Sequence, residues 1–198
     1  MALRKTLNEA DFEDGPVVVA TGMTADSYFA LPQVSQPQNL IEGRLCTSPS
    51  PFWKHQRVVG TLFVAVDAFA EQHGGAAILS PMDCKLPGGD VLQPDVGYIA
   101  AGREEIIQDH VMGAPDLVIE VLSQGTRRFD RTKKLEAYGR NGVREAWLVD
   151  PEAESVTLFF GDGTRWVEET SVLFGEAVPS RIVDIGDAKL GALRQPGD

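Results

Sequence analysis

Cysteine is scarce in this sequence of 198 residues, which contains only Cys46 and Cys84. Neither belongs to a Cys-x-x-Cys pair or a Cys/His cluster, which argues against a zinc site and a disulfide framework. Every apolar run is far shorter than the roughly 20 residues that a membrane-spanning helix requires. The first residues, MALRKTLNEADFED, lack the apolar core of a signal peptide. We therefore expect a cytoplasmic protein without a membrane partner.

Basic residues are also in deficit, because 18 Lys and Arg oppose 29 Asp and Glu, for a formal net charge of −11. Over the whole chain this charge argues against nucleic acid, whose phosphates bind clustered cations. The distribution alters that conclusion, since seven basic and only two acidic residues lie between Arg127 and Arg144. Either a solvated helix face or a local anion-binding surface explains this segment.

Hydrophobic residues make up 43% of the chain, which is enough for the core of one domain. We predict a loosely packed leader over residues 1–23 and a single domain over 24–198. The pattern predicts helices over 53–73 and 128–140, and a short helix capped by Thr24. The strands that it predicts are NLIEGRLCT, AAILSPMDCKL, DVLQPDVGYIA, DLVIEVL, REAWLVD, a hairpin formed by SVTLFF and TRWVEE, and a short strand near RIVDI. This order indicates an α/β (α+β) fold, with a central mixed sheet flanked by helices and a C-terminal hairpin.

One carboxylate interrupts the most apolar predicted strand, 117–122, whose sequence is LVIEVL. The strand period of two places Glu120 on one face with Val118 and Leu122. Asp95 lies near the end of another predicted strand, because the preceding proline cannot donate to a β-ladder. A buried carboxylate is costly, and two neighbouring ones raise each other's pKa unless a cation lies between them.

A lysine faces inward on the predicted helix 128–140. At 100° per residue, Lys134 lies on the side of Ala137 and Tyr138, whereas Lys133 lies on the polar side. Lysine seldom occupies such a position without a partner. An i,i+4 ion pair with Asp130 is one explanation.

A divalent cation is the other explanation for this set of residues. Mg²⁺ is commonly held by one or two carboxylates together with waters and phosphate oxygens. The hypothesis is that Asp95 and Glu120 hold a metal, and that Lys134 extends toward both of them from the following helix.

Four segments in chain order carry a resemblance to a known family. They are LIEGRLCTSPSPFWKHQRVVGTL, QPDVGYIA, APDLVIEVLS and RRFDRTKKLEAYGRNGVREAWLVDP. These segments resemble the Uma family of bacterial restriction-endonuclease-like proteins, part of the PD-(D/E)XK superfamily, over roughly residues 24–160. The resemblance implies a restriction-endonuclease-like fold and Mg²⁺-dependent hydrolysis of phosphodiester bonds, with Mn²⁺ as a substitute. It implies nucleic acid as the partner, with DNA favoured over RNA.

The resemblance also assigns roles by position. Asp95 matches the aspartate of the PD motif and Glu120 the second acid, so both are expected to bind the metal, together with the Val121 carbonyl oxygen. Leu122 occupies the position where the superfamily usually has lysine. Uma-like sequences take that lysine from a DRxxK helix, which makes Lys134 the third expected catalytic residue here.

Further residues are expected around this site with less specific roles. The possible neighbours of the site are Glu42, His55, Gln93, Asp130 and Tyr138. The residues expected to bind the nucleic-acid backbone are Arg127, Arg128 and Arg131. His55 and Tyr138 are equally compatible with packing roles. Asn39 stands where Uma-like sequences usually have an acid.

Two alternatives to a nuclease remain open on the sequence. One is a nuclease-fold module with weak or lost catalysis that binds nucleic acid or a protein partner, which the acidic charge and Asn39 favour. The other is a metal-dependent hydrolase of a small phosphorylated molecule. A homodimer fits a nuclease that cuts both strands of a duplex, because a two-fold axis relates two sites. Phe52 and Trp53 are interpreted as surface anchors or a dimer contact.

Overall fold

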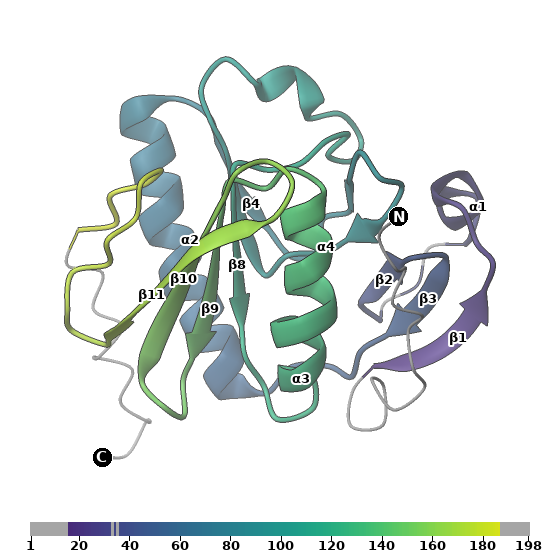
Figure 1. Ribbon diagram of the computed structural model, residues 1–198, viewed down its shortest axis with the longest axis horizontal. Coiled ribbons are helices and arrows are strands. Elements are labelled where there is room, and N and C mark those ends of the chain that lie inside the picture. The colour runs from purple at the N-terminus through teal and green to yellow at the C-terminus, as the bar shows by residue number, and fades with distance from the viewer. Residues whose placement is uncertain (1–15, 33, 35, 187–198) are drawn as a thin grey trace.

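A computed structural model describes residues 16–32, 34 and 36–186 of the chain. Its larger sheet has six strands and forms the centre of the fold (Figure 1). In order across this sheet they are β11 (Trp166–Leu173), β10 (Ser155–Gly161), β9 (Glu145–Asp150), β8 (Leu117–Val121), β7 (Val96–Ile99) and β4 (Ala76–Leu79). Strands β8 and β9 are parallel and all other neighbours are antiparallel, so the predicted mixed sheet and its C-terminal hairpin β10–β11 are confirmed.

A smaller antiparallel sheet lies beside the first. Its order is β1 (Val17–Thr21), β3 (Arg44–Thr47), β2 (Gln38–Ile41), β6 (Val91–Leu92) and β5 (Cys84–Lys85). The prediction of one strand over NLIEGRLCT was wrong, because this segment forms the hairpin β2–β3. Glu42 and Gly43 turn the chain with φ angles of 49° and 74°, the left-handed conformation that two-residue hairpin turns require.

The two long strands predicted around PGGD are each divided between the two sheets. The chain leaves the large sheet after β4 to form β5, and it returns from β6 to form β7. Pro81 and Pro94 lie at these two crossings, where a residue without an N–H disrupts no ladder. The second crossing places Asp95 directly before the first residue of β7.

Helices cover both faces of the large sheet (Figure 1). On one face lies α2 (Trp53–His73), whose buried side chains join a core cluster with alternate residues of β7, β8, β9 and β10. On the other face, a continuous helical segment consists of α3 (Arg127–Phe129), the π-helical turn η3 (Asp130–Lys134) and α4 (Leu135–Arg140). Both predicted long helices are therefore confirmed. The core on this second face also includes residues of the small sheet, which ties the two sheets together.

The remaining elements are short. Helix α1 (Ala25–Phe29) begins with the predicted Thr24 cap, whose hydroxyl accepts a hydrogen bond from Ser27 N at 3.2 Å. A single 3₁₀ turn, η2 (Glu104–Ile106), interrupts the connection between β7 and β8. None of the helices in the described part of the chain is long and apolar enough to cross a membrane.

Both ends of the predicted domain differ from expectation. No strand forms near RIVDI within the described residues; Val183 packs into the core there without joining a ladder. Residues 1–15 of the predicted leader lie outside the described residues. The end of that leader forms β1, an edge strand of the small sheet paired with β3. The division into a leader and one domain stays a prediction.

The junction between α2 and β4 provides a test of how tightly the fold holds its edge strand. Gly75 has a φ of +85°, and a Cβ atom there would lie 2.2 Å from Ile99 O. Gly102 has a similar φ of +82° but open space around it. We expect Gly75→Ala to lower the free energy of unfolding by about 3 kcal/mol or more, from backbone strain plus overpacking. Gly102→Ala should cost only the strain, about 1–2 kcal/mol. If urea unfolding showed that Gly75→Ala and Gly102→Ala lose the same free energy of unfolding, the predicted clash with Ile99 O would be contradicted.

Candidate active site

Two neighbouring strands bring the predicted carboxylates together. Val96 of β7 pairs with Ile119 of β8 in an antiparallel register, so the next position of the ladder sets Asp95 opposite Glu120. Asp95 Oδ2 accepts a hydrogen bond from Val121 N at 2.8 Å, and its main-chain oxygen accepts one from Ser80 N at 3.1 Å. The crossing between the sheets thus fixes Asp95 at the end of β7, facing the middle of β8.

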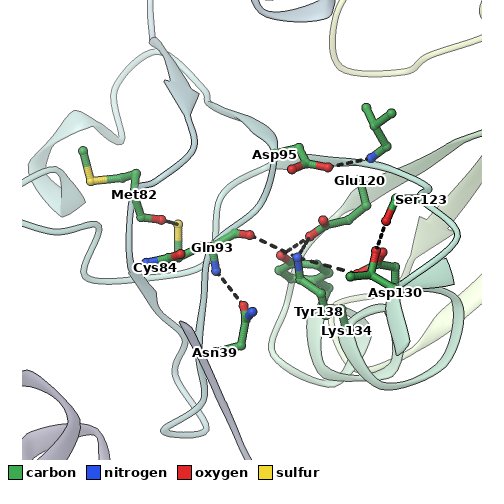
Figure 2. A network of polar contacts seen from close by, with 12 residues as sticks. Asn39, Met82, Cys84, Gln93, Asp95, Glu120, Ser123, Asp130, Lys134 and Tyr138 are labelled. Atoms are coloured by element: carbon green, nitrogen blue, oxygen red, sulfur yellow. Dashed lines mark hydrogen bonds and ion pairs between the residues drawn. The ribbon is translucent and has the colours of Figure 1, made fainter. Parts of the chain in front are cut away.

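Lys134 reaches the Glu120 carboxylate from the helical segment on the same face (Figure 2). Its Nζ lies 2.6 Å from Glu120 Oε1 and donates to Gln93 O at 3.0 Å. Both Lys134 and Glu120 are almost fully buried, with 5% and 3% of their surfaces exposed. The distance to Asp130 Oδ1 is longer, at 4.0 Å. The inward lysine predicted from the helical period is therefore confirmed, and Glu120 rather than Asp130 is its nearest partner.

Tyr138 belongs to the same cluster. Its hydroxyl donates to Glu120 Oε1 at 2.6 Å, and both groups are buried. Residues four apart on a helix share a face, which is why Tyr138 and Lys134 meet the same carboxylate. Tyr138 is therefore a neighbour of the site as well as a packed residue.

Burial dominates the electrostatics of this cluster. It raises the pKa of Glu120 to about 8, although the charge of Lys134 opposes the shift. Burial likewise raises the pKa of Asp130 to about 6. Burial alone would lower the pKa of Lys134, but the surrounding carboxylates of Glu120, Asp130 and Asp95 outweigh it and raise that pKa. Lys134 is therefore a persistent ammonium ion, suited to donating hydrogen bonds and neutralising charge rather than to removing a proton.

His55 adjoins the site from the first turn of α2. Its Nε2 lies 3.1 Å from Asp95 Oδ2. Burial lowers the pKa of His55, but the hydrogen bond and charge of Asp95 raise it by more, so the net shift is upward. The other ring nitrogen, Nδ1, is buried and has no hydrogen-bond partner among the described residues. His55 is thus brought to the site, where it holds the oxygen of Asp95 that also binds the β8 backbone.

Gln93 and Asn39 connect the site to the small sheet. Gln93 N donates to Asn39 Oδ1 at 3.0 Å, and Gln93 Nε2 donates to Asp83 Oδ1 at 2.9 Å. Gln93 is therefore a site neighbour, as predicted. Asn39 is a residue that the predicted site set omitted, although its departure from the family pattern pointed to it. Its amide oxygen accepts the backbone hydrogen bond that a carboxylate would accept, without adding another negative charge.

Glu42 and Arg127 are placed elsewhere. The Glu42 carboxylate pairs with Arg140 at 3.1 Å and does not line the cleft that holds the other residues. The prediction that Glu42 adjoins the site is therefore wrong, because the β2–β3 turn carries it outward. Arg127 forms ion pairs with Asp150 and with Glu152 that hold the helix start against β9. Arg128 and Arg131 are exposed. The predicted binding of nucleic acid by these three arginines stays a prediction, which the pairing of Arg127 does not favour.

The clustered side chains form the floor of a cleft of about 240 Å³. Its walls come from the segment before α2, the first turns of α2, and the loop between β8 and α3. The site residues that line it are Asn39, His55, Gln93, Asp95, Glu120, Val121, Asp130 and Lys134. The cleft thus opens the buried ion pair to a substrate.

The donors at the cleft floor fit Mg²⁺ or Mn²⁺ better than Zn²⁺. Every hydrogen bond and ion pair of the Asp95 side chain to the described residues falls on Oδ2, and those of Glu120 fall on Oε1. One oxygen of each carboxylate is therefore available to a cation. In the described part of the chain, no three His, Cys, Asp or Glu side chains gather as a metal cluster. Two carboxylates completed by waters are typical of Mg²⁺ sites, whereas Zn²⁺ favours three or four nitrogen or sulfur ligands.

A comparison with protein families assigns the chain to one of them. Residues 25–186 match the Uma2 family, whose description is "Putative restriction endonuclease". The chain belongs to the Uma2 family. This membership confirms the resemblance inferred from the sequence, and it supports a nuclease-like function for the protein. A search of the curated proteins finds no match.

One solved structure confirms the fold. A crystal structure of a putative nuclease belonging to DUF820 from Anabaena variabilis ATCC 29413 aligns with a TM-score of 0.73 and 22% sequence identity. The alignment covers 87% of this chain and 99% of that one. The chain in a DrdV–DNA complex aligns with a TM-score of only 0.37, at 16% identity, over 71% of this chain and 13% of that one. The Uma2 protein therefore has the restriction-endonuclease-like fold predicted from its motifs.

The raised pKa of Glu120 predicts how stability depends on pH once its partner is lost. In Lys134→Met, the lowering effect of Lys134 disappears, so the pKa of Glu120 in the folded state rises further above about 8. The folded state then binds more protons than the unfolded state, whose Glu120 titrates near 4.5. In both the wild type and the variant, the free energy of unfolding should fall by up to about 1.4 kcal/mol per pH unit from about pH 5 to 8. Above pH 8 this loss should level off in the wild type but continue in Lys134→Met.

Lys133→Met is the matched control, because it removes the same charge from the adjacent, less buried position. Its unfolding free energy, measured in urea at each pH, should run parallel to that of the wild type. A Lys134→Met curve that also levelled off above pH 8, parallel to the wild type, would show that the two buried groups are not coupled.

Proposed function

We propose that this Uma2 protein is a metal-dependent endonuclease that hydrolyses phosphodiester bonds in DNA, with Mg²⁺ as cofactor and Mn²⁺ as its substitute. The observation that carries the proposal is the buried Lys134–Glu120 ion pair at 2.6 Å, set opposite Asp95 on the floor of an open cleft. DNA is the preferred substrate because the family description refers to restriction, an activity on DNA.

Asp95, Glu120 and the carbonyl oxygen of Val121 would hold the metal. When bound, Mg²⁺ would polarise the scissile phosphate and lower the pKa of a water molecule. His55 and Val121 N occupy Asp95 Oδ2, which fixes the carboxylate and leaves Oδ1 for the cation. Tyr138 fixes Glu120 in the same way through Oε1. These second contacts preorganise both ligands.

Lys134 supplies the positive charge of the protein at the reacting centre. Because its pKa is raised, the ammonium group stays protonated, orients the attacking water and stabilises the charge that develops on the phosphate. Its hydrogen bond to Gln93 O holds the side chain between the two acidic strands. A protein that only bound nucleic acid would gain little from this arrangement, since buried ion pairs are no better at stabilising a fold than apolar side chains of similar volume.

Cleavage of plasmid DNA and of single-stranded DNA tests the proposal. We expect nicking in Mg²⁺ or Mn²⁺ and none in EDTA. Glu120→Gln and Lys134→Ala should each lower the rate by about 100-fold or more, because each removes a charge from the reacting centre. Lys133→Ala is the matched control and should cleave like the wild type.

Two outcomes would contradict the proposed site. Activity that persists in EDTA, or that survives both Glu120→Gln and Lys134→Ala, would place any hydrolysis at another site. Circular dichroism of each variant establishes that lost activity does not reflect lost folding.

A further inference from the structure

Two large aromatic side chains are exposed at the start of α2, the helix whose first turns form part of the cleft wall. Phe52, the N-cap residue of α2, is 77% exposed, and Trp53, the first helical residue, is 62% exposed. Phe52 is itself part of the cleft wall, and three residues later in the chain His55 contacts Asp95. Along the helix axis, three residues correspond to a rise of about 4.5 Å between Phe52 and His55.

Basic side chains are interleaved with the rings. Lys54 and Arg57 are exposed, and neither makes an ion pair with a described residue. The guanidinium of Arg57 lies 5.9 Å from the centroid of the Trp53 ring. In a chain with 29 acidic and 18 basic residues, most of the described cations are paired with acids. Exposed, unpaired cations beside exposed rings therefore distinguish this part of the surface.

This combination fits unpaired nucleobases better than it fits an apolar protein surface. Sites for single-stranded nucleic acid combine aromatic side chains, on which bases stack, with cations that follow the phosphates. A purely apolar partner would leave Lys54 and Arg57 buried without counter-ions, which is costly. The bases of an intact duplex stack on each other and offer no free face to Phe52 or Trp53.

We propose that Phe52 and Trp53 form a base-stacking platform, and that the preferred substrate is single-stranded DNA, including the unpaired strand at a flap or gap. The platform receives bases next to the phosphate in the cleft, while Lys54 and Arg57 bind the flanking phosphates. The inference that this strand is cut rests on the proposed nuclease function, whereas the binding of the strand does not.

A second copy of the chain is the competing occupant of this surface. The net charge of −11 opposes both occupants, so the preference for a DNA strand rests on the local cations Lys54 and Arg57, which attract its phosphates. The two occupants also differ in a measurable way, because only one of them produces a dimer.

Trp53 provides the signal for the test. The chain has three tryptophans; Trp147 is fully buried and Trp166 is partly buried against the core. Stacked bases should therefore quench the fluorescence of Trp53 above all. We would titrate the full chain, in EDTA to prevent cleavage, with a single-stranded oligonucleotide and with a blunt duplex of the same sequence. We expect quenching and tighter binding with the single strand only.

Four variants separate stacking from other roles, with binding followed by the anisotropy of a labelled oligonucleotide. Phe52→Ala and Trp53→Ala should each weaken single-strand binding by roughly tenfold, the effect of losing one stacked base. Trp53→Phe should restore binding, because a ring remains. Val64→Ala, at a 67% exposed position of the same helix, should bind like the wild type.

Several results would overturn the platform. These are equal binding of single strand and duplex, full affinity in Trp53→Ala, or a dimer in sedimentation velocity that Trp53→Ala dissociates. The last result would assign the surface to a second copy. A wild type that binds the single strand but cleaves nothing in Mg²⁺ contradicts the nuclease function and leaves the platform standing. If single strand and duplex are cleaved at equal rates, and Trp53→Ala does not change those rates, the nuclease function stands and the platform is contradicted.

Discussion

The buried ion pair between Lys134 and Glu120 is the interaction on which the rest of the site depends. Its 2.6 Å separation joins the centre of β8 to the helical segment that covers the sheet. Without Lys134, Glu120 would be a buried carboxylate with an even higher pKa, and without Glu120 the lysine would lose its nearest partner. Removing one member of such a pair commonly costs about 3–5 kcal/mol. The same ion pair therefore forms part of the candidate site and holds the helical segment against the sheet.

The exchange of strands between the two sheets supplies the other half of the site. Because the chain returns from β6 to β7 through Pro94, Asp95 emerges opposite Glu120, and the Gln93 carbonyl oxygen is left to accept from Lys134. Asn39 holds this crossing from the small sheet. The small sheet thus acts on the site through the backbone. This explains how a neutral amide serves at position 39, where the resemblance to Uma-like sequences led us to expect an acid.

Periodicity predicted the parts of the site that depend on one element at a time. The strand period identified Glu120 as an interior carboxylate, and the helical period identified Lys134 as an inward lysine. The position of a side chain that depends on two elements was harder to predict. The Glu42–Gly43 turn divides an apolar stretch into a hairpin and carries Glu42 away from the cleft, and no local pattern showed that Asp150 would bind Arg127. The fold class followed from element order, whereas the division of strands between two sheets depends on long-range pairing.

The location of the metal tests the central claim most directly. Crystals soaked in Mn²⁺ would give an anomalous difference peak wherever the ion binds. The account predicts one strong peak between the carboxylates of Asp95 and Glu120 in the wild type, and no such peak in Asp95→Asn. A wild-type cleft without a peak, or a peak that persists in Asp95→Asn, would contradict the assignment of these two strand carboxylates as a metal site.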